Sequence, residues 1–218
     1  MRILLGYLLT FGWVFLMLGL TMVLKKATNA DDEVSRKIIH VSVAFAWIPM
    51  YFCFGTSWHL PVPTAVFIIL NYVSYKKNLF AAMERTDESK KSLGTVYYAI
   101  SMTVMAICAV LRPACIIPYG IASFCMALGD GFAPIFGSIK KGNRKLLGSR
   151  TLYGSASVFV ICFVVIIVMS TIFSLELGIV KALIIAVAAT LLELIGLRGL
   201  DNLTLPLGVF FLLNLFLR

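Results

Sequence analysis

Long runs of apolar residues, separated by short polar segments, make up most of this sequence. A helix needs about 20 apolar residues to cross the hydrocarbon core of a bilayer, so these runs predict eight membrane spans. The predicted spans are 3–24, 37–55, 59–75, 93–111, 113–136, 152–174, 177–196 and 202–217. Prolines in the third and last spans are compatible with a kinked or re-entrant helix, so seven spans is the alternative. We therefore expect an all-α fold, a polytopic membrane bundle of seven or eight helices forming one domain over residues 1–218.

The composition agrees with a membrane protein. Hydrophobic residues make up 61% of the chain and charged residues 13%, whereas soluble domains carry about a quarter charged residues. The five cysteines fall in apolar spans without a C-x-x-C pair, so neither a disulfide framework nor a zinc site is indicated. No folded soluble module is present to display the basic charge, so nucleic acid is not an expected partner.

The net charge of +9 is distributed unevenly between the two predicted sides of the membrane. The first, third, fifth and seventh loops hold 15 of the 19 Lys and Arg residues. Cytoplasmic loops carry the excess of basic residues, so these loops are predicted to face the cytoplasm and both termini the other side. The same cations also suit contact with anionic lipid.

Polar residues gather at the predicted cytoplasmic ends of the spans. Arg36 and His40 are four residues apart, so they share a helix face on which they can hold a phosphate. The alternative is that Arg36 anchors at the headgroups while His40 packs in the interior. Farther along, Lys90 and Lys91 precede Tyr97 and Tyr98. We interpret that group as a basic flank followed by an interfacial aromatic belt, with phosphate contact as the alternative.

Asp130 is the most informative residue, because a charge at membrane depth is costly. Gly129 and Gly131 flank it and would allow a ligand to approach the backbone closely. A basic loop follows, containing Lys140, Lys141, Arg144, Lys145 and Arg150. A carboxylate beside clustered cations suits a metal-bridged phosphate. The alternative is that Asp130 pairs with a Lys or Arg to fix helix packing.

Glycines recur in and around this loop, at positions 137, 142, 148 and 154. They would allow the backbone N–H groups to wrap a polyphosphate, although the Walker pattern is absent. Farther on, Glu193 lies inside a predicted span, and Asp201 and Asn202 begin the next one. An intramembrane Glu indicates a functional site, and Asp201 and Asn202 offer oxygen ligands for a metal. Asn202 is also a suitable helix cap.

These groupings, in this order, resemble the polyprenol kinase family, which includes dolichol kinase, phytol kinase and CTP-dependent diacylglycerol kinase. More distantly they resemble phosphatidate cytidylyltransferases. The resemblance rests on R-K-x-x-H from Arg36 to His40, G-D-G-x-A from Gly129 to Ala133 followed by Gly137, the Arg150-Thr151-x-x-Gly154-Ser155 stretch, and D-N-L-x-x-P from Asp201 to Pro206 after Glu193. The chain departs from the family pattern K-[ST]-x-E-G-S at Arg150 and Tyr153. Tyr153 removes a metal ligand or base.

The resemblance implies transfer of a phosphoryl group from a nucleoside triphosphate, typically CTP, to a lipid alcohol. On this hypothesis Asp130 and Asp201 bind Mg²⁺, and the catalytic group consists of Asp130, Asp201, Asn202, Glu193 and His40. The residues expected to bind the nucleotide are Arg36, Lys37, Gly129, Gly131, Gly137, Lys140, Lys141, Arg144, Lys145, Arg150 and Thr151. The expected partners are a membrane lipid and the nucleotide, with a homo-oligomer left open.

Three alternatives remain at this stage. A cytidylyltransferase would use the same nucleotide and metal to make a CDP-lipid. A transporter would use Asp130 and Glu193 as an ion path, although no inverted repeat is visible. A non-catalytic lipid-binding protein would explain Tyr153. The lack of a targeting extension leads us to expect a prokaryotic plasma membrane, with the active site facing the cytoplasm.

Overall fold

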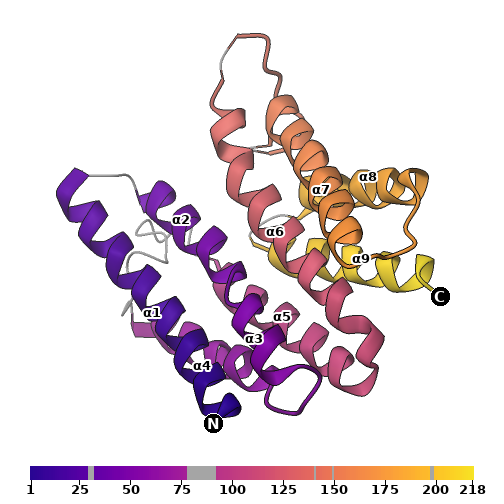
Figure 1. The fold of residues 1–218 in the computed structure, drawn as a ribbon. Coiled ribbons are helices and arrows are strands. Elements are labelled where there is room, and N and C mark those ends of the chain that lie inside the picture. Colours follow the sequence, from indigo (N-terminus) through magenta and orange to yellow (C-terminus); the bar gives the residue numbers. More distant parts are fainter. Residues whose placement is uncertain (29–31, 78–91, 140, 149, 197–198) are drawn as a thin grey trace. The chain divides into compact units, whose positions relative to one another are not determined.

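The computed structural model describes residues 1–218 except 29–31, 78–91, 140, 149 and 197–198. Its regular structure over these residues is helical, as predicted (Figure 1). The helices are α1 (Arg2–Thr28), α2 (Asp32–Ala44), α3 (Trp47–Phe54), α4 (Pro61–Lys77), α5 (Gly94–Leu111), the 3₁₀ turn η2 (Pro113–Cys115), α6 (Ile116–Gly137), α7 (Leu152–Ile172), α8 (Ile179–Ile195) and α9 (Asp201–Phe216). Each of the eight predicted spans therefore corresponds to helix.

Within the described residues, five helical segments are long and apolar enough to cross a bilayer: Arg2–Thr28, Val34–Phe54, Gly94–Leu111, Pro113–Gly137 and Leu152–Ile172. Helices α4 and α8 have 17 residues each and α9 has 16. At 1.5 Å per residue, such helices reach about 25 Å, less than the hydrocarbon thickness of about 30 Å. The seven or eight predicted spans thus correspond to helices, and five of the helical segments in the described part of the chain are long enough to cross the bilayer.

The second predicted span, 37–55, is broken into α2 and α3. Pro49 lacks the N–H that would bond to the carbonyl of Phe45, and its ring crowds that carbonyl. The Phe45 oxygen accepts instead from the amide of Ile48 at 3.1 Å, a tighter 3₁₀-type contact. A single proline therefore accounts for the turn between the two helices.

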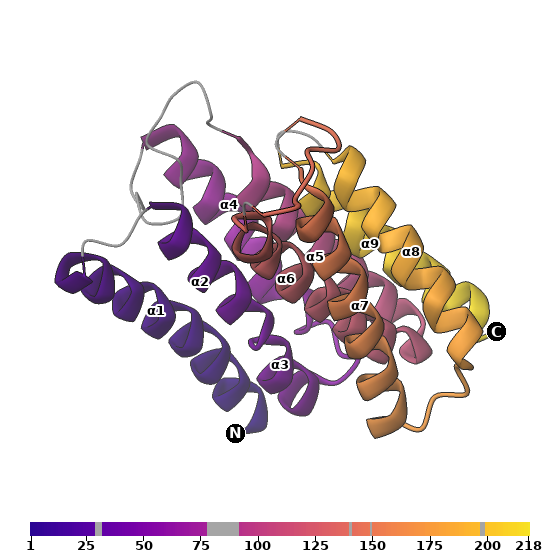
Figure 2. The ribbon, with the colours of Figure 1, turned by 90° about the horizontal axis from the view of Figure 1, so that it is seen from above.

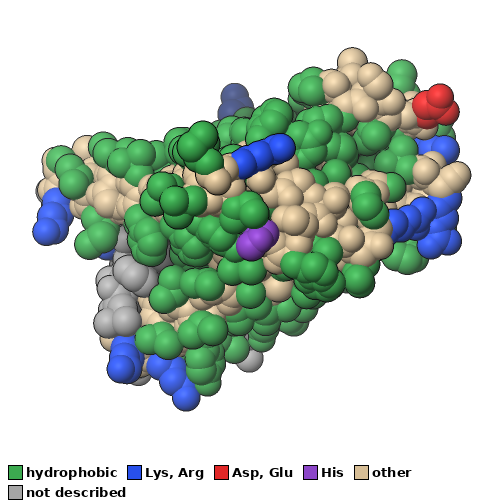
Figure 3. Space-filling model, turned by 60° about the horizontal axis from the view of Figure 1, so that its bottom comes forward, with side chains coloured by type: hydrophobic (Ala, Val, Ile, Leu, Met, Phe, Trp, Pro, Cys, Tyr) green, Lys and Arg blue, Asp and Glu red, His purple; other side chains and the backbone are tan. Residues whose placement is uncertain are grey.

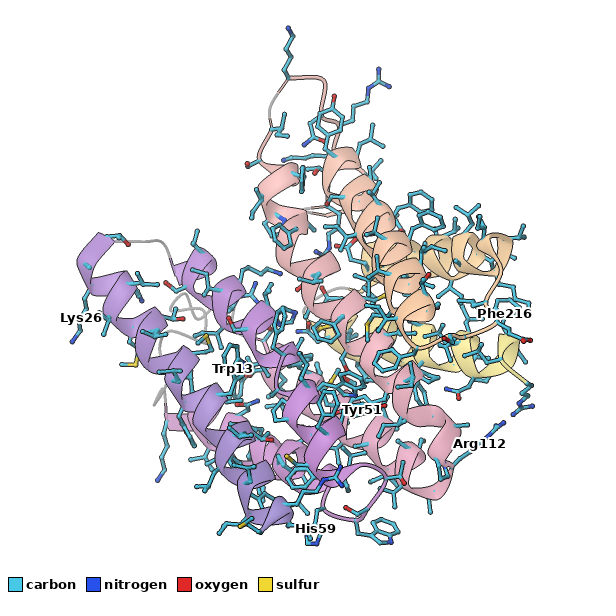
Figure 4. The ribbon with its side chains drawn as sticks, viewed as in Figure 1. Trp13, Lys26, Tyr51, His59, Arg112 and Phe216 are labelled. Atoms are coloured by element: carbon cyan, nitrogen blue, oxygen red, sulfur yellow. The ribbon has the colours of Figure 1, made fainter. Side chains whose placement is uncertain are left out.

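The helices form two compact units, Met1–Ile116 and Ile117–Arg218, which we describe separately. In the first unit, α1 packs on α2 and α3, and α4 packs on α5 (Figure 2). Trp13 of α1 donates from Nε1 to the carbonyl of Ser42 on α2 at 2.8 Å (Figure 4). In the second unit, α7 packs on α8 and α8 on α9. The expectation that the chain acts as one domain stays a prediction.

The outer surface of the helices is strongly apolar. Hydrophobic side chains cover much of the face shown in Figure 3. Along α7, Val160, Val164 and Val168 are exposed, whereas Val158 and Cys162 on another side of the helix are fully buried. A helix that is apolar on its exposed side as well as its buried side is suited to lipid rather than water. These helices indicate a multi-pass membrane protein.

Candidate functional site

Three carboxylates from three different helices lie buried in the second unit. Asp130 is near the end of α6, Glu193 near the end of α8 and Asp201 at the start of α9. Their exposed fractions are 4%, 1% and 6%. A buried carboxylate is costly unless it is paired or binds a metal, so this burial requires a cation.

Arg150 supplies that cation to all three carboxylates. Its Nη1 lies 2.5 Å from Oε1 of Glu193 and 3.8 Å from Oδ1 of Asp130, and its Nη2 donates to Oδ2 of Asp201. Nη2 also reaches the carbonyl of Gly196 at 3.4 Å. We call Arg150 and its three carboxylates the Arg150 cluster. One guanidinium is thus shared by three carboxylates.

The pKa of Arg150 responds to two opposing effects. Burial lowers the pKa of the guanidinium, because its charged form loses water. The three carboxylates, Glu193 first, outweigh that effect and raise the pKa above its ordinary value. Arg150 therefore stays charged throughout the physiological range.

A small hairpin in the α6–α7 loop holds Arg150 in place. The amide of Arg150 donates to the carbonyl of Leu147, and the amide of Leu146 donates to the carbonyl of Arg150, both at 2.9 Å. Gly148 closes the turn with a φ of 57°, a conformation that favours glycine. Lys145 and Thr151 form an antiparallel bridge at the base. This loop extends beyond the ends of α6 and α7 (Figure 1).

Asn143 ties the same loop to both helices. Its Nδ2 donates to the carbonyl of Gly137 at 2.9 Å, and its Oδ1 accepts from the amide of Tyr153 at 3.0 Å. The sequence analysis did not single out this residue. The signal available was an Asn within a Gly-containing loop, since Asn side chains commonly bond to nearby backbone.

The backbone N–H groups in the first turn of α7 donate to residues of the preceding loop and to the helix cap. The amide of Leu152 donates to the carbonyl of Arg144, the amide of Tyr153 to Asn143, and the amide of Gly154 to Oγ1 of Thr151. Thr151 is thus the helix cap, as its side chain suits it to be. These three N–H groups are not available for a phosphate in this conformation.

The predicted nucleotide-binding glycines have close packing neighbours. A Cβ on Gly129 would lie 3.2 Å from Sγ of Cys162 on α7, and one on Gly137 would lie 3.0 Å from Oγ1 of Thr151. Gly131 is also buried in α6. These contacts bring α6 and α7 close together, and the nucleotide-binding role of the glycines stays a prediction.

The loop cations divide into two kinds. Lys141, Arg144 and Lys145 are exposed, whereas Arg150 belongs to the cluster. Lys140 lies outside the described residues. Tyr153, which stands where the family often has Glu, places its hydroxyl 2.8 Å from where a Cβ on Gly142 would be. It therefore lies against the loop.

Asn202 and Gly196 complete the surroundings of Asp201. Asn202 is buried, and its backbone N–H donates to Oδ1 of Asp201 at 3.1 Å. A Cβ on Gly196 would lie 2.6 Å from the backbone N and Cα of Asp201. Only glycine allows that approach, which sets Asp201 against the end of α8. The sequence alone does not reveal the role of Gly196, because this contact joins the end of α8 to the start of α9.

The predicted residues of the first unit lie on α2. Lys37 and His40 are buried, and Arg36 is partly exposed. The ring of His40 packs on the ring of Tyr98 from α5, with centroids 5.0 Å apart and planes inclined by 32°. Tyr98 is buried, so the interpretation as an aromatic belt does not hold for it. Lys90 and Lys91 lie outside the described residues.

The chemistry of the Arg150 cluster fits a hard divalent cation. Its ligating atoms would be carboxylate oxygens, which Mg²⁺ and Ca²⁺ prefer. No three His, Cys, Asp or Glu side chains within the described ranges are arranged as a ready-made metal site. Arg150 instead holds the carboxylates together in this conformation.

Comparison with known proteins gives one informative likeness. The chain is similar to a phytol kinase of Synechocystis sp. (strain ATCC 27184 / PCC 6803 / Kazusa). The two are 27% identical over 196 residues, covering 85% of this chain and 80% of that protein. No family model matches the chain, and no solved structure matches it significantly. The likeness supports a relationship to polyprenol and phytol kinase-like proteins.

Proposed function

We propose that this protein is a membrane-embedded kinase that transfers the γ-phosphoryl group of a nucleoside triphosphate to a lipid alcohol. The observation that carries the proposal is the convergence of Asp130, Glu193 and Asp201 on Arg150. Phosphoryl transfer depends mostly on positioning and charge neutralisation, for which carboxylates, a metal ion and fixed cations are the usual parts. The likeness to a phytol kinase supports the same class of reaction.

In this proposal Asp130 and Asp201 hold Mg²⁺. Both carboxylates already lie on one guanidinium, so both are aimed at a common centre of positive charge. When bound, Mg²⁺ would neutralise negative charge on the phosphate oxygens. Arg150 would then exchange part of its carboxylate contacts for the phosphates of the nucleotide.

The remaining cations have a separate role in the proposal. The triphosphate would be neutralised by Lys140, Lys141, Arg144 and Lys145. The last three are exposed, so their ammonium and guanidinium groups are accessible to a nucleotide. The proposed donor is CTP, by analogy with the family that the sequence resembles. Arg36, Lys37 and His40 of the first unit would hold a phosphate or orient the acceptor hydroxyl.

The chemical step conserves atoms and charge. The oxygen of the lipid alcohol forms a bond to the γ-phosphorus as the bond from that phosphorus to the β–γ bridging oxygen breaks. The nucleoside diphosphate leaves with that oxygen, and the proton of the alcohol passes to a carboxylate, for which we propose Asp201 or Glu193. Asn202 would orient Asp201, to which its backbone amide already donates.

The test is phosphorylation of phytol and other lipid alcohols by the purified protein with Mg²⁺ and either CTP or ATP. Asp130→Asn keeps the size of the side chain but removes its charge, so it should lower turnover by at least 100-fold. Glu176→Gln, an exposed carboxylate in the α7–α8 loop, is the matched control and should keep activity. Full activity in Asp130→Asn would overturn the proposed role of Asp130.

A further inference from the structure

The hydroxyl of Tyr98 is buried in the first unit without a hydrogen-bond partner. Tyr98 lies on α5 and is 7% exposed, and its Oη has no partner among the described residues. Buried tyrosine hydroxyls usually find a partner, because the group otherwise loses its bonds to water without replacement. Phenylalanine would fill the same space without that cost. A buried hydroxyl without a partner at such a position therefore points to a ligand.

The surroundings of Tyr98 include a buried histidine and, on the same face of α2, a buried lysine. Its ring lies on that of His40, and Lys37 is three residues before His40 on α2, so both project from one side of that helix. Both side chains are buried. A phenol hydroxyl beside an imidazole ring favours a ligand that carries an oxygen atom.

The two helices that carry these residues are fixed by bonds to their neighbours. The side-chain amide of Asn71 on α4 donates to the carbonyl of Thr95, one turn before Tyr98, at 3.0 Å. On the other side, Trp13 of α1 bonds to Ser42 on α2, half a turn after His40. Helices α2 and α5, which carry His40 and Tyr98, are therefore each hydrogen-bonded to a neighbouring helix before any ligand binds.

The depth of Tyr98 suits the head of a lipid alcohol. Tyr98 is the fifth residue of α5, a helix of full crossing length. At 1.5 Å per residue, it lies about 6 Å inward from the first residue of the helix. In the predicted topology this end of α5 is at the cytoplasmic surface, where the hydroxyl of a long-chain alcohol would lie with its chain in the hydrocarbon.

We propose that Tyr98 binds the acceptor, through a hydrogen bond between its hydroxyl and the hydroxyl of the lipid alcohol, in a site shared with His40 and Lys37. The class of ligand rests on the proposed kinase function, whereas the site itself rests on the buried hydroxyl. Tyr98 is thus an acceptor-binding residue that the sequence motifs do not include.

The test compares two ligands and three proteins without requiring turnover. Binding of phytol, and of phytane, which lacks the hydroxyl, is measured by thermal stabilisation of the purified protein in one detergent. The proteins are the wild type, Tyr98→Phe, and Tyr97→Phe as the matched control, since Tyr97 is the partly exposed neighbour. The loss of one neutral hydrogen bond should weaken phytol binding about threefold to tenfold in Tyr98→Phe alone.

Two readouts separate a binding role from a structural one. Tyr98→Phe should be at least as stable as the wild type without ligand, and it should bind phytane as the wild type does. Equal phytol binding by the wild type and Tyr98→Phe, or equal affinity of the wild type for phytol and phytane, would overturn the proposal. Tyr98-dependent phytol binding without phosphate transfer would instead overturn the kinase assignment and leave this site standing.

Discussion

At the scale of single residues, the second unit depends on Arg150. Its guanidinium contacts Glu193, Asp130 and Asp201, all of which are buried. Buried ion pairs contribute little net stability when complete, but removing one partner leaves uncompensated charge. The arrangement makes the arginine side chain a structural requirement for folding of this unit as well as a proposed ligand of the nucleotide.

We expect Arg150→Met to destabilise the protein by about 3–5 kcal/mol, because three buried carboxylates lose their shared cation. Arg150→Lys should cost less, since it keeps the charge but cannot contact three carboxylates with a planar fork. Thermal unfolding of the purified variants measures both. Arg144→Met, in the same loop but exposed, should stay within about 0.5 kcal/mol of the wild type. A stable Arg150→Met protein would show that the carboxylates are satisfied in another way.

The sequence indicated the members of this cluster but not their pairing. Asp130, Glu193 and Asp201 each stood out as a charge in or beside an apolar run. The Arg150-Thr151-x-x-Gly154-Ser155 stretch distinguishes Arg150 from the other four cations of the loop, but it does not show which carboxylates Arg150 contacts. The hairpin turn at Gly148 places Arg150, and only the folded loop shows that turn. The alternative that Asp130 pairs with a basic residue agrees with the observed geometry.

At the scale of helices, small residues decide how closely α6 and α7 approach. A Cβ on Gly154 would lie 3.1 Å from the carbonyl oxygen of Ala133 and 3.2 Å from Oγ1 of Thr151. One of these atoms belongs to backbone and cannot move without shifting α6. The base of the Arg150 hairpin, which begins between these helix ends, depends on the same approach.

Gly154→Ala should therefore destabilise the protein by about 1–3 kcal/mol, as overpacking of a close contact does. Gly19→Ala on α1 is the matched control, because a Cβ there would meet nothing within 4 Å and Ala is the better helix former. Unfolding of the two variants in the same detergent gives the comparison. Equal stability of Gly154→Ala and the wild type would mean that the α6–α7 contact relaxes freely.

Helix positions were well predicted from the sequence, and their interruptions were not. Apolar runs long enough for a helix are a strong local signal, and each of the eight corresponds to helix in the structure. The apolar run 37–55 predicts one continuous span, and apolarity alone does not reveal the break before Pro49. The burial of Tyr98 was also missed, since it depends on how α2 and α5 pack and not on the residues next to it.

At the scale of the whole molecule, the apolar helices indicate a multi-pass membrane protein, and the sequence is similar to that of a phytol kinase. The exposed valines of α7 suit contact with lipid, whereas the carboxylates of the Arg150 cluster suit a cation. The identity of the nucleotide, the metal and the side of the membrane remain parts of the proposal. A kinase and a cytidylyltransferase differ in the part of the nucleotide that they transfer to the lipid, which is the γ-phosphoryl group for the kinase and the cytidylyl group for the cytidylyltransferase.

The most direct measurement follows that group. Purified protein is incubated with Mg²⁺, phytol or another lipid alcohol, and CTP that carries ³²P at the γ-position and ³H in the cytidine, and the lipid is then extracted. The account predicts ³²P without ³H in the lipid, because the γ-phosphoryl group alone is transferred. The account would be contradicted if the lipid carried no label with CTP and none with γ-labelled ATP. It would also be contradicted if a phosphatidate acceptor took up ³H from CTP.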